Sequence, residues 1–278
     1  MSSRQLKKGL IPETKELDNI YDNFIVEKNP PLPYIIQHFK SLEGEGGDNA
    51  VGLTTLFLRL NKCNLSCNFC DTSFSIKGDE KYNIVRADTD LTELLNEKYS
   101  EEDRKYIHSC SITGGEPLIH LEHFEDIIEE LLESFNGINH IIVETNGLYL
   151  YKKENAMKFA ELSNIYADRI KFTLSISPKL DARVSYGKAG RNGDINEKNI
   201  LDIYEVVFKN YKRYLTNVVN IQCKFVHSQV LKESNEPLMD IIINNNYIYP
   251  RTKILIMPFT PLAKITDYEK KWKESKDA

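Results

Sequence analysis

Short apolar runs alternate along this chain with longer segments in which apolar residues recur at helical spacing. In residues 121–135, for example, Phe124, Ile127 and Leu131 fall on one face of a helix. Alternation of strands and helices predicts parallel strands that are covered by helices. We therefore expect an α/β fold.

The pattern divides the chain into two sets of segments. The predicted strands are residues 34–39, 53–60, 106–113, 140–144, 170–176, 218–225 and 253–257. The predicted helices are residues 91–99, 121–135, 153–162, 200–211 and 236–244. About six parallel strands are too few for a closed barrel of eight units. The sequence therefore predicts a partial, open βα barrel with helices outside.

Two regions do not follow the alternation. Residues 1–30 are polar and end in a proline-rich run at 30–33, which predicts an N-terminal extension followed by a stiff connector. Residues 31–278 would then form the domain that carries the function. Residues 183–199 contain three glycines among charged residues, which predicts a long loop.

The charge balance excludes some partners. A formal net charge of −5 gives no overall basic field that would attract nucleic acid or an acidic membrane. No apolar run is long enough to span a bilayer, and the first residues lack the apolar core of a signal peptide. We expect a cytoplasmic protein.

Three of the five cysteines lie close together, at Cys63, Cys67 and Cys70. Thiolates are soft ligands that suit zinc and iron–sulfur clusters. A structural zinc site needs four closed ligands, whereas three thiolates on a four-iron cluster leave one iron open for another ligand. The triplet alone leaves a zinc site or a structural cluster as alternatives. Cys110 and Cys223 lie in apolar surroundings and are predicted to be buried.

A second motif follows the predicted strand 106–113. Gly114 and Gly115 allow close approach of the backbone, and the Glu116 carboxylate after them could receive an ammonium group. Read alone, the segment is a turn in which Pro117 starts a helix. Polar residues also follow the strands that end near residues 144 and 176, where barrel-like folds place their active sites.

The cysteine spacing, with Phe69 before its last cysteine, and the Gly-Gly-Glu-Pro segment together resemble the radical S-adenosylmethionine (SAM) superfamily. The resemblance implies a 4Fe–4S cluster on Cys63, Cys67 and Cys70, with SAM on the open iron. It also implies the following cofactor-binding residues: Phe69, Asp71, Gly114, Gly115, Glu116, Ser177, Pro178, Lys179, Met257 and Pro258.

Within that superfamily, residues 39–46, 57–60, 63–65 and 70–72 resemble the 7-carboxy-7-deazaguanine synthase family. The similarity covers roughly residues 34–260. It implies radical-mediated ring contraction of 6-carboxy-5,6,7,8-tetrahydropterin to 7-carboxy-7-deazaguanine with loss of ammonia, a carbon–nitrogen lyase reaction of 7-deazapurine (queuosine-type) biosynthesis. It also implies a homodimer and an external electron donor such as a flavodoxin.

The family resemblance assigns roles on the substrate side. Arg59 and Thr72 would be catalytic, with Thr72 binding a magnesium ion. The implied substrate-binding residues are Leu42, Glu43, Gly44, Arg59 and Thr113. The plainer alternatives are a surface ion pair of Arg59 with Glu43 or Glu45, and a helix cap at Asp71 and Thr72.

The chain departs from the usual family pattern in three places. Glu43 replaces a glutamine, Lys62 replaces the glycine before the first cysteine, and residues 1–30 and 181–220 are longer. Two other functions share parts of the pattern. One is an activase that forms a glycyl radical on a partner protein, and the other is a zinc or iron–sulfur interaction module without enzymatic activity.

Overall fold

The computed structural model describes residues 15–26, 31–44, 50–227 and 253–258. Their strands form one eight-stranded sheet in the order β3-β1-β2-β4-β5-β6-β7-β8. The strands are β1 (Tyr34–Leu42), β2 (Thr54–Leu60), β3 (Val85–Arg86), β4 (Ser109–Gly114), β5 (His140–Thr145), β6 (Lys171–Ile176), β7 (Val219–His227) and β8 (Lys253–Pro258).

The sheet is mostly parallel and open. The six strands from β2 through β4, β5, β6 and β7 to β8 run parallel to their neighbours. Strand β1 is antiparallel to both β2 and β3. Strands β3 and β8 are the two edges in the described part of the chain, so the sheet does not close. The predicted open α/β fold with about six parallel strands is confirmed.

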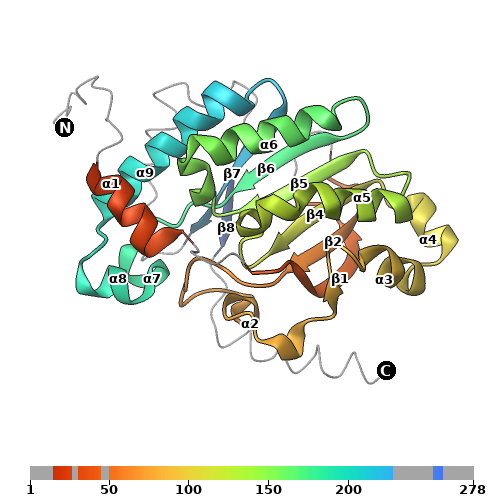
Figure 1. The fold of residues 1–278 in the computed structure, drawn as a ribbon, viewed down its shortest axis with the longest axis horizontal. Helices are drawn as coiled ribbons and strands as arrows, with labels where there is room; N and C mark the ends of the chain where they lie inside the picture. Colours follow the sequence, from red (N-terminus) through yellow and green to blue (C-terminus); the bar gives the residue numbers. More distant parts are fainter. Residues whose placement is uncertain (1–14, 27–30, 45–49, 228–252, 259–278) are drawn as a thin grey trace.

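Helices cover one side of the sheet, where α5, α6 and α9 lie beside one another (Figure 1). The α-helices are α1 (Lys15–Ile20), α2 (Ser73–Ile76), α3 (Leu91–Lys98), α4 (Glu101–Tyr106), α5 (Phe124–Ser134), α6 (Lys153–Ile165), α7 (Ala182–Ser185), α8 (Gly187–Asn192) and α9 (Glu197–Asn210). Shorter helical turns are η1 (Tyr21–Ile25), η3 (Glu80–Tyr82), η4 (Pro117–His123), η5 (Leu148–Tyr151) and η6 (Tyr211–Leu215).

The predicted helices near α3, α5, α6 and α9 are confirmed, and the one at 236–244 lies outside the described residues.

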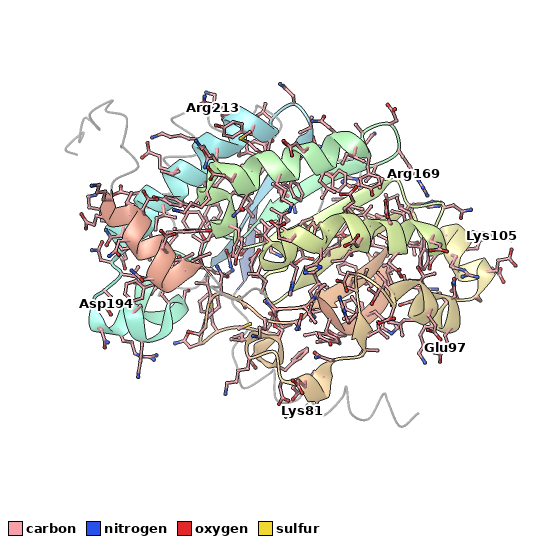
Figure 2. All side chains as sticks on the ribbon, in the orientation of Figure 1. Lys81, Glu97, Lys105, Arg169, Asp194 and Arg213 are labelled. Carbon is pink, nitrogen blue, oxygen red and sulfur yellow. The ribbon has the colours of Figure 1, made fainter. Side chains whose placement is uncertain are left out.

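The core lies between these helices and the sheet. Phe159 of α6 is fully buried and packs edge-on against Phe124 of α5 and Phe172 of β6, with ring centroids 6.2 and 6.0 Å apart. Such edge-to-face contacts add to the energy of burying the rings. Charged side chains such as Lys105 of α4, Arg169 after α6 and Arg213 of η6 project outward from the surface (Figure 2). Among the helices described, none is both long and apolar enough to cross a bilayer.

The described part of the N-terminal extension packs against this core. Leu17, Ile20, Tyr21 and Ile25 are buried with the rest of the apolar cluster. The ring of Tyr21 stacks on Tyr151 at 4.7 Å between centroids. The division of the chain at residue 30 stays a prediction.

The long loop expected at 183–199 is wrong, because this segment contains α7, α8 and the start of α9. Helix α8 ends at Gly193, which has the left-handed φ of 79° that favours glycine. Asn196 and Asn199 then form a capping box that starts α9.

Gly187 and Gly193 mark the two ends of α8, and Gly190 lies inside it, where a Cβ atom would be 1.8 Å from the Ala182 carbonyl oxygen. These glycines therefore serve helix ends and close packing rather than an irregular loop.

Candidate functional site

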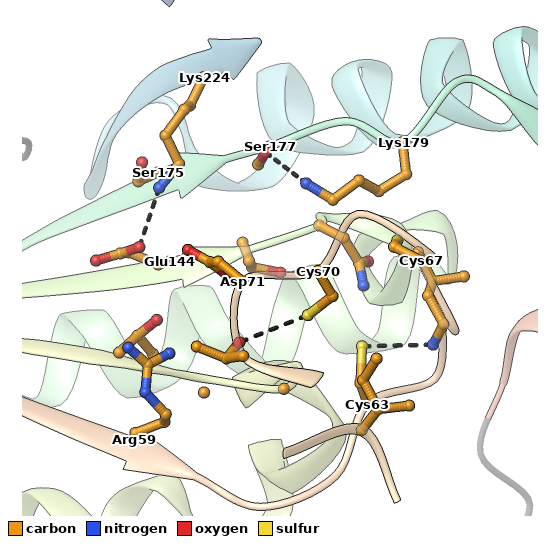
Figure 3. A pocket seen from close by; sticks show the side chains of 18 of the residues that line it. Arg59, Cys63, Cys67, Cys70, Asp71, Glu144, Ser175, Ser177, Lys179 and Lys224 are labelled. Carbon is orange, nitrogen blue, oxygen red and sulfur yellow. Dashed lines mark hydrogen bonds and ion pairs between the residues drawn. The ribbon is translucent and has the colours of Figure 1, made fainter. Parts of the chain in front are cut away.

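A cavity of about 310 Å³ opens at the carboxyl ends of the parallel strands (Figure 3). One group of lining residues comes from strands: Phe39, Phe57, Arg59, Thr113, Gly114, Glu144, Thr145, Ser175 and Lys224. A second group comes from the segment after β2: Cys63, Leu65, Cys67, Phe69, Cys70, Asp71, Thr72 and Ile76. Gly115, Asn146, Ser177 and Lys179 complete the lining. Parallel strands bring their carboxyl ends to the same edge, which is why these residues meet.

The three predicted cluster cysteines lie together on one side of this cavity, and their thiols are free. The loop that carries them is held locally, since the Cys70 N–H donates to the Cys67 carbonyl at 3.3 Å and the Leu65 N–H to the Cys63 sulfur at 3.4 Å. Burial raises the pKa of the Cys63 and Cys67 thiols. Cys110 and Cys223 are fully buried in the core, as predicted.

The residues present fit an iron–sulfur cluster. Three soft thiols surround one side of a cavity that is larger than a single ion. Within the described residues, no three His, Cys, Asp or Glu side chains are grouped tightly enough to hold one metal ion. The Asn64 Nδ2 atom in the same loop is buried and has no hydrogen-bond partner among the residues described, which leaves a donor beside the cysteines.

The two glycines of the second motif lie against the backbone of the cysteine loop. The Gly115 N–H donates to the Leu60 carbonyl at 3.1 Å, and the Glu116 N–H donates to the Lys62 carbonyl at 2.8 Å. A Cβ atom at Gly115 would lie 1.7 Å from the Lys62 oxygen. The sequence predicts that these glycines let the backbone approach a ligand closely. In the structure, Gly115 also closely approaches the backbone of the cysteine loop.

Lys62 itself has a left-handed backbone, with φ of 60°, and it is the one non-glycine residue with positive φ in the described part of the chain. This conformation costs a residue with a Cβ atom about 1–2 kcal/mol. It explains why the family pattern has glycine at this position. The chain tolerates lysine here at some cost in stability.

Glu116 is fully buried and does not line the cavity. One carboxylate oxygen accepts from the Thr145 hydroxyl and the Leu118 N–H, and the other accepts from the Asn146 N–H at 2.7 Å. Burial raises the pKa of Glu116 to about 7, although these hydrogen bonds oppose the rise. The structure thus assigns Glu116 to the junction of β4, η4 and β5. Its predicted contact with an ammonium group stays a prediction.

Charged side chains gather at the other end of the cavity, as Figure 3 shows for Arg59, Glu144 and Lys224. The Arg59 Nε atom donates to the Gln37 side chain at 3.0 Å. The Glu144 carboxylate accepts from the Lys224 ammonium at 3.0 Å and from the Ser111 hydroxyl at 3.1 Å. Burial opposes ionisation of Glu144, but Lys224 and the hydrogen bonds hold its pKa below the usual value.

Asp71 and Thr72 line the cavity beside the last cysteine. Thr72 occupies the cap position of α2, but its side chain makes no capping hydrogen bond. Its hydroxyl lies 3.6 Å from the Cys70 sulfur instead. The helix-cap alternative therefore accounts for the position of Thr72 and not for the direction of its oxygen.

The remaining predicted cofactor residues fall into two groups. Lys179 donates to the Ser177 hydroxyl at 2.7 Å and lies 6.0 Å from the Phe69 ring centroid, and all three line the cavity. Pro178 is buried behind them. Met257 and Pro258 pair with the end of β7 in β8, and their side chains lie outside the described part.

The predicted pterin-binding residues are not brought to the cavity. Leu42 is 68% exposed, whereas Glu43 is only 3% exposed. Neither residue lines the cavity, and neither does Gly44. The Glu43 backbone exchanges hydrogen bonds with Leu53 and Gly52 in the connection from β1 to β2. The substrate contacts of these three residues stay a prediction.

Sequence reasoning missed five lining side chains: Phe39, Phe57, Leu65, Ile76 and Lys224. Phe39 and Phe57 stack at 4.9 Å with nearly parallel rings, and Lys224 pairs with Glu144. Period-two alternation would have found Phe57, because it shares a strand face with Arg59. Lys224 carries no local signal, since its role depends on the pairing of β6 with β7.

Replacing Gly115 by alanine should displace the cysteine loop, because the new Cβ atom would overlap the Lys62 carbonyl. We expect reconstituted Gly115→Ala to lose most of its iron and to unfold with a free energy lower by at least about 2 kcal/mol. Gly44→Ala is the matched control, since no atom of the described residues lies within 4 Å of its Cβ position. Full iron content in Gly115→Ala would contradict the contact.

Glu116 should make the stability of the metal-free chain depend on pH. Its folded-state pKa of about 7 exceeds the ordinary 4.5, so the folded chain keeps a proton that the unfolded chain has lost between these values. The free energy of unfolding should therefore fall as the pH rises through this window, by on the order of 2–3 kcal/mol from Glu116 alone.

Urea unfolding at pH 4.5, 6 and 8 measures this dependence. Glu116→Gln should flatten the pH profile, whatever its absolute stability. Glu122→Gln, which alters a carboxylate that is 67% exposed, should leave the profile unchanged. Parallel pH profiles for the wild type and Glu116→Gln would rule out the raised pKa.

Comparisons with known proteins are consistent with this geometry. A family model described as the radical SAM superfamily matches residues 58–222, more than half of the chain. The 7-carboxy-7-deazaguanine synthase of Methanothermobacter thermautotrophicus is 31% identical over 185 residues, which are 66% of this chain and 68% of that protein. The enzyme of the same name from Clostridium acetobutylicum is 27% identical over 181 residues, 64% of this chain and 71% of that protein.

Among solved structures, the crystal structure of QueE from Escherichia coli aligns with 88% of this chain and 99% of that chain, at 17% identity and a TM-score of 0.43.

The match of the radical SAM family model over residues 58–222 includes all three cysteines of the cavity and both glycines beside them. The chain therefore belongs to the radical SAM superfamily and, within it, to the 7-carboxy-7-deazaguanine synthase family.

Proposed function

We propose that this chain catalyses the ring contraction of 6-carboxy-5,6,7,8-tetrahydropterin to 7-carboxy-7-deazaguanine, with loss of ammonia. The observation that carries the proposal is that three cysteines and a group of charged side chains line opposite parts of one cavity. Its volume of about 310 Å³ lies at the lower end of the range for small-molecule sites. When bound, the 4Fe–4S cluster and SAM supply the adenosyl radical that starts the reaction.

The cofactor end of the cavity is formed by Cys63, Cys67 and Cys70. Phe69 offers a flat apolar surface next to them, and Lys179 holds a positive charge near its ring. The Gly114–Gly115 segment contributes backbone to the same wall. These groups would hold the cluster and orient SAM against the substrate.

The opposite end has the charges that a carboxylated pterin needs. Arg59 and Lys224 give two cations against the single carboxylate of Glu144, so this end of the cavity favours an anion. Arg59 can bind a carboxylate with two parallel hydrogen bonds. Glu144 remains ionised and can accept hydrogen bonds from ring N–H groups. The stacked Phe39 and Phe57 rings offer an apolar wall for a flat bicyclic ring.

Thr72 would bind magnesium between the two ends, together with the substrate carboxylate. Carboxylate and hydroxyl oxygens are hard ligands, and magnesium keeps several waters beside few protein ligands. The position of the Thr72 hydroxyl next to the Cys70 sulfur supports this role. The ion would then hold the substrate carboxylate near the cluster side of the cavity. The external electron donor and the homodimer stay predictions.

An anaerobic assay tests the proposed reaction. Reconstituted protein is incubated with SAM, a low-potential reductant, magnesium and the carboxytetrahydropterin, and the product is identified by its ultraviolet spectrum and mass. We expect 7-carboxy-7-deazaguanine from the wild type and none from Cys67→Ala, with Cys223→Ala as the active cysteine control. SAM cleavage without this product, by protein with four irons per chain, would point to another radical reaction such as glycyl-radical activation.

Replacing Thr72 by valine should abolish the effect of magnesium on turnover without preventing cluster assembly. The substitution keeps the side-chain shape and removes the oxygen, so cluster assembly should survive. Turnover should fall about 10²-fold, because orientation of the substrate carbon is lost. Magnesium should stimulate the wild type but not Thr72→Val, and the exposed Thr89→Val serves as the control. Full wild-type activity in metal-free buffer would refute the role of Thr72.

A further inference from the structure

Helices α7 and α8 hold the cysteine loop at the residue before Cys67. The Ser66 N–H donates to the Ser185 carbonyl at 3.0 Å. Gly187 lies so close to the loop that a Cβ atom there would be 2.5 Å from the Ser66 hydroxyl. The Tyr186 hydroxyl donates to the Lys179 carbonyl at 2.9 Å, which fixes this segment to the cavity wall.

The hydroxyl of Ser185 is buried, and the described residues do not satisfy its hydrogen-bonding capacity. Ser185 is 1% exposed, and its hydroxyl oxygen has no hydrogen-bond partner among the residues described. The carbonyl of Ser185 accepts from the N–H of Ser66, the residue before Cys67, so the hydroxyl is carried on a residue that contacts the cysteine loop. Burial raises the pKa of the Cys67 thiol, and the nearby Ser185 hydroxyl opposes that rise. Leaving a buried hydroxyl unpaired is unfavourable. A bound thiolate at Cys67 would supply the missing acceptor.

We propose that the Ser185 hydroxyl donates a hydrogen bond to the Cys67 sulfur of the loaded cluster and thereby raises the cluster's reduction potential. The inference rests on the cluster in the proposed function and adds a residue that tunes it. Hydrogen bonds to cysteine sulfurs and solvent exposure are among the factors that set such potentials.

The effect has a simple electrostatic origin. An external one-electron donor adds one negative charge to the cluster, and part of that charge lies on the coordinating sulfurs. No bond is formed or broken at Ser185, which keeps its proton throughout. A hydroxyl that donates to the Cys67 sulfur would interact more strongly with the reduced state than with the oxidised state. Ser185 therefore makes reduction easier, and its loss should make the cluster harder to reduce.

Two variants remove the hydroxyl in different ways. Ser185→Ala and Ser185→Gly both leave the backbone carbonyl that receives the Ser66 N–H. The matched control is Ser163→Ala, which removes another buried serine hydroxyl, one that donates to the Phe159 carbonyl inside α6. Ser185→Thr keeps a hydroxyl and serves as the conservative replacement.

The measurement is a redox titration of reconstituted protein with four irons per chain, followed by electron paramagnetic resonance in the absence of substrate. We expect Ser185→Ala and Ser185→Gly to have lower potentials, by up to about tenfold in the ratio of reduced to oxidised cluster, or ~59 mV for one electron. Ser163→Ala and Ser185→Thr should match the wild type.

Each contrary result overturns the proposal. An unchanged potential in fully loaded Ser185→Ala or Ser185→Gly shows that the hydroxyl does not act on the cluster. Failure of both variants to hold four irons shows that Ser185 has a structural role instead. The titration uses neither the pterin nor product formation, so a wrong assignment of the reaction would leave its result intact. A wild type that binds no iron would defeat both proposals, and iron analysis detects that case first.

Discussion

The backbone contact between the end of β4 and the cysteine loop is the constraint on which the site depends. Gly115 and Glu116 donate to the Leu60 and Lys62 carbonyls, so the loop leaves β2 directly over the end of the neighbouring strand. No side chain fits between the two backbones at Gly115. This contact sets where the three thiols lie relative to the strand ends, and Lys62 adopts a strained backbone to complete it.

The parallel sheet supplies the rest of the site from residues far apart in sequence. Register places Arg59 beside Thr113, and Glu144 beside Ser175. Glu116 links two neighbouring segments behind the cavity. Its buried carboxylate accepts hydrogen bonds from the start of η4 and from the residue after β5. The paired strand ends thus form one side of the cavity, and the cysteine loop forms another. Helices α7 and α8 hold that wall from outside.

Much of the fold could be predicted because its signals are local. Helical spacing in α5 and the apolar runs of β4 and β5 reflect the burial of one helix face and both faces of a sheet. The prediction of a loop at 183–199 was wrong because glycines occur both in loops and in tightly packed short helices. In the site, the cysteines, Arg59, Thr72 and Thr113 were predicted to act together and do line one cavity. Leu42, Glu43 and Gly44 do not.

The sequence by itself determined the alternation of strands and helices, the chemistry of the three thiols and the membership of the chain in its family. These depend on residue types at short spacing, which remain visible without a structure. Only the tertiary structure decided that Glu116 is turned into the junction behind the cavity, that Lys224 pairs with Glu144, and that Ser185 is buried against the residue before Cys67. Each of these depends on strand register or on packing between distant segments. Such contacts produce no recurring pattern in the amino-acid sequence, because they depend on the whole sheet and not on neighbouring residues.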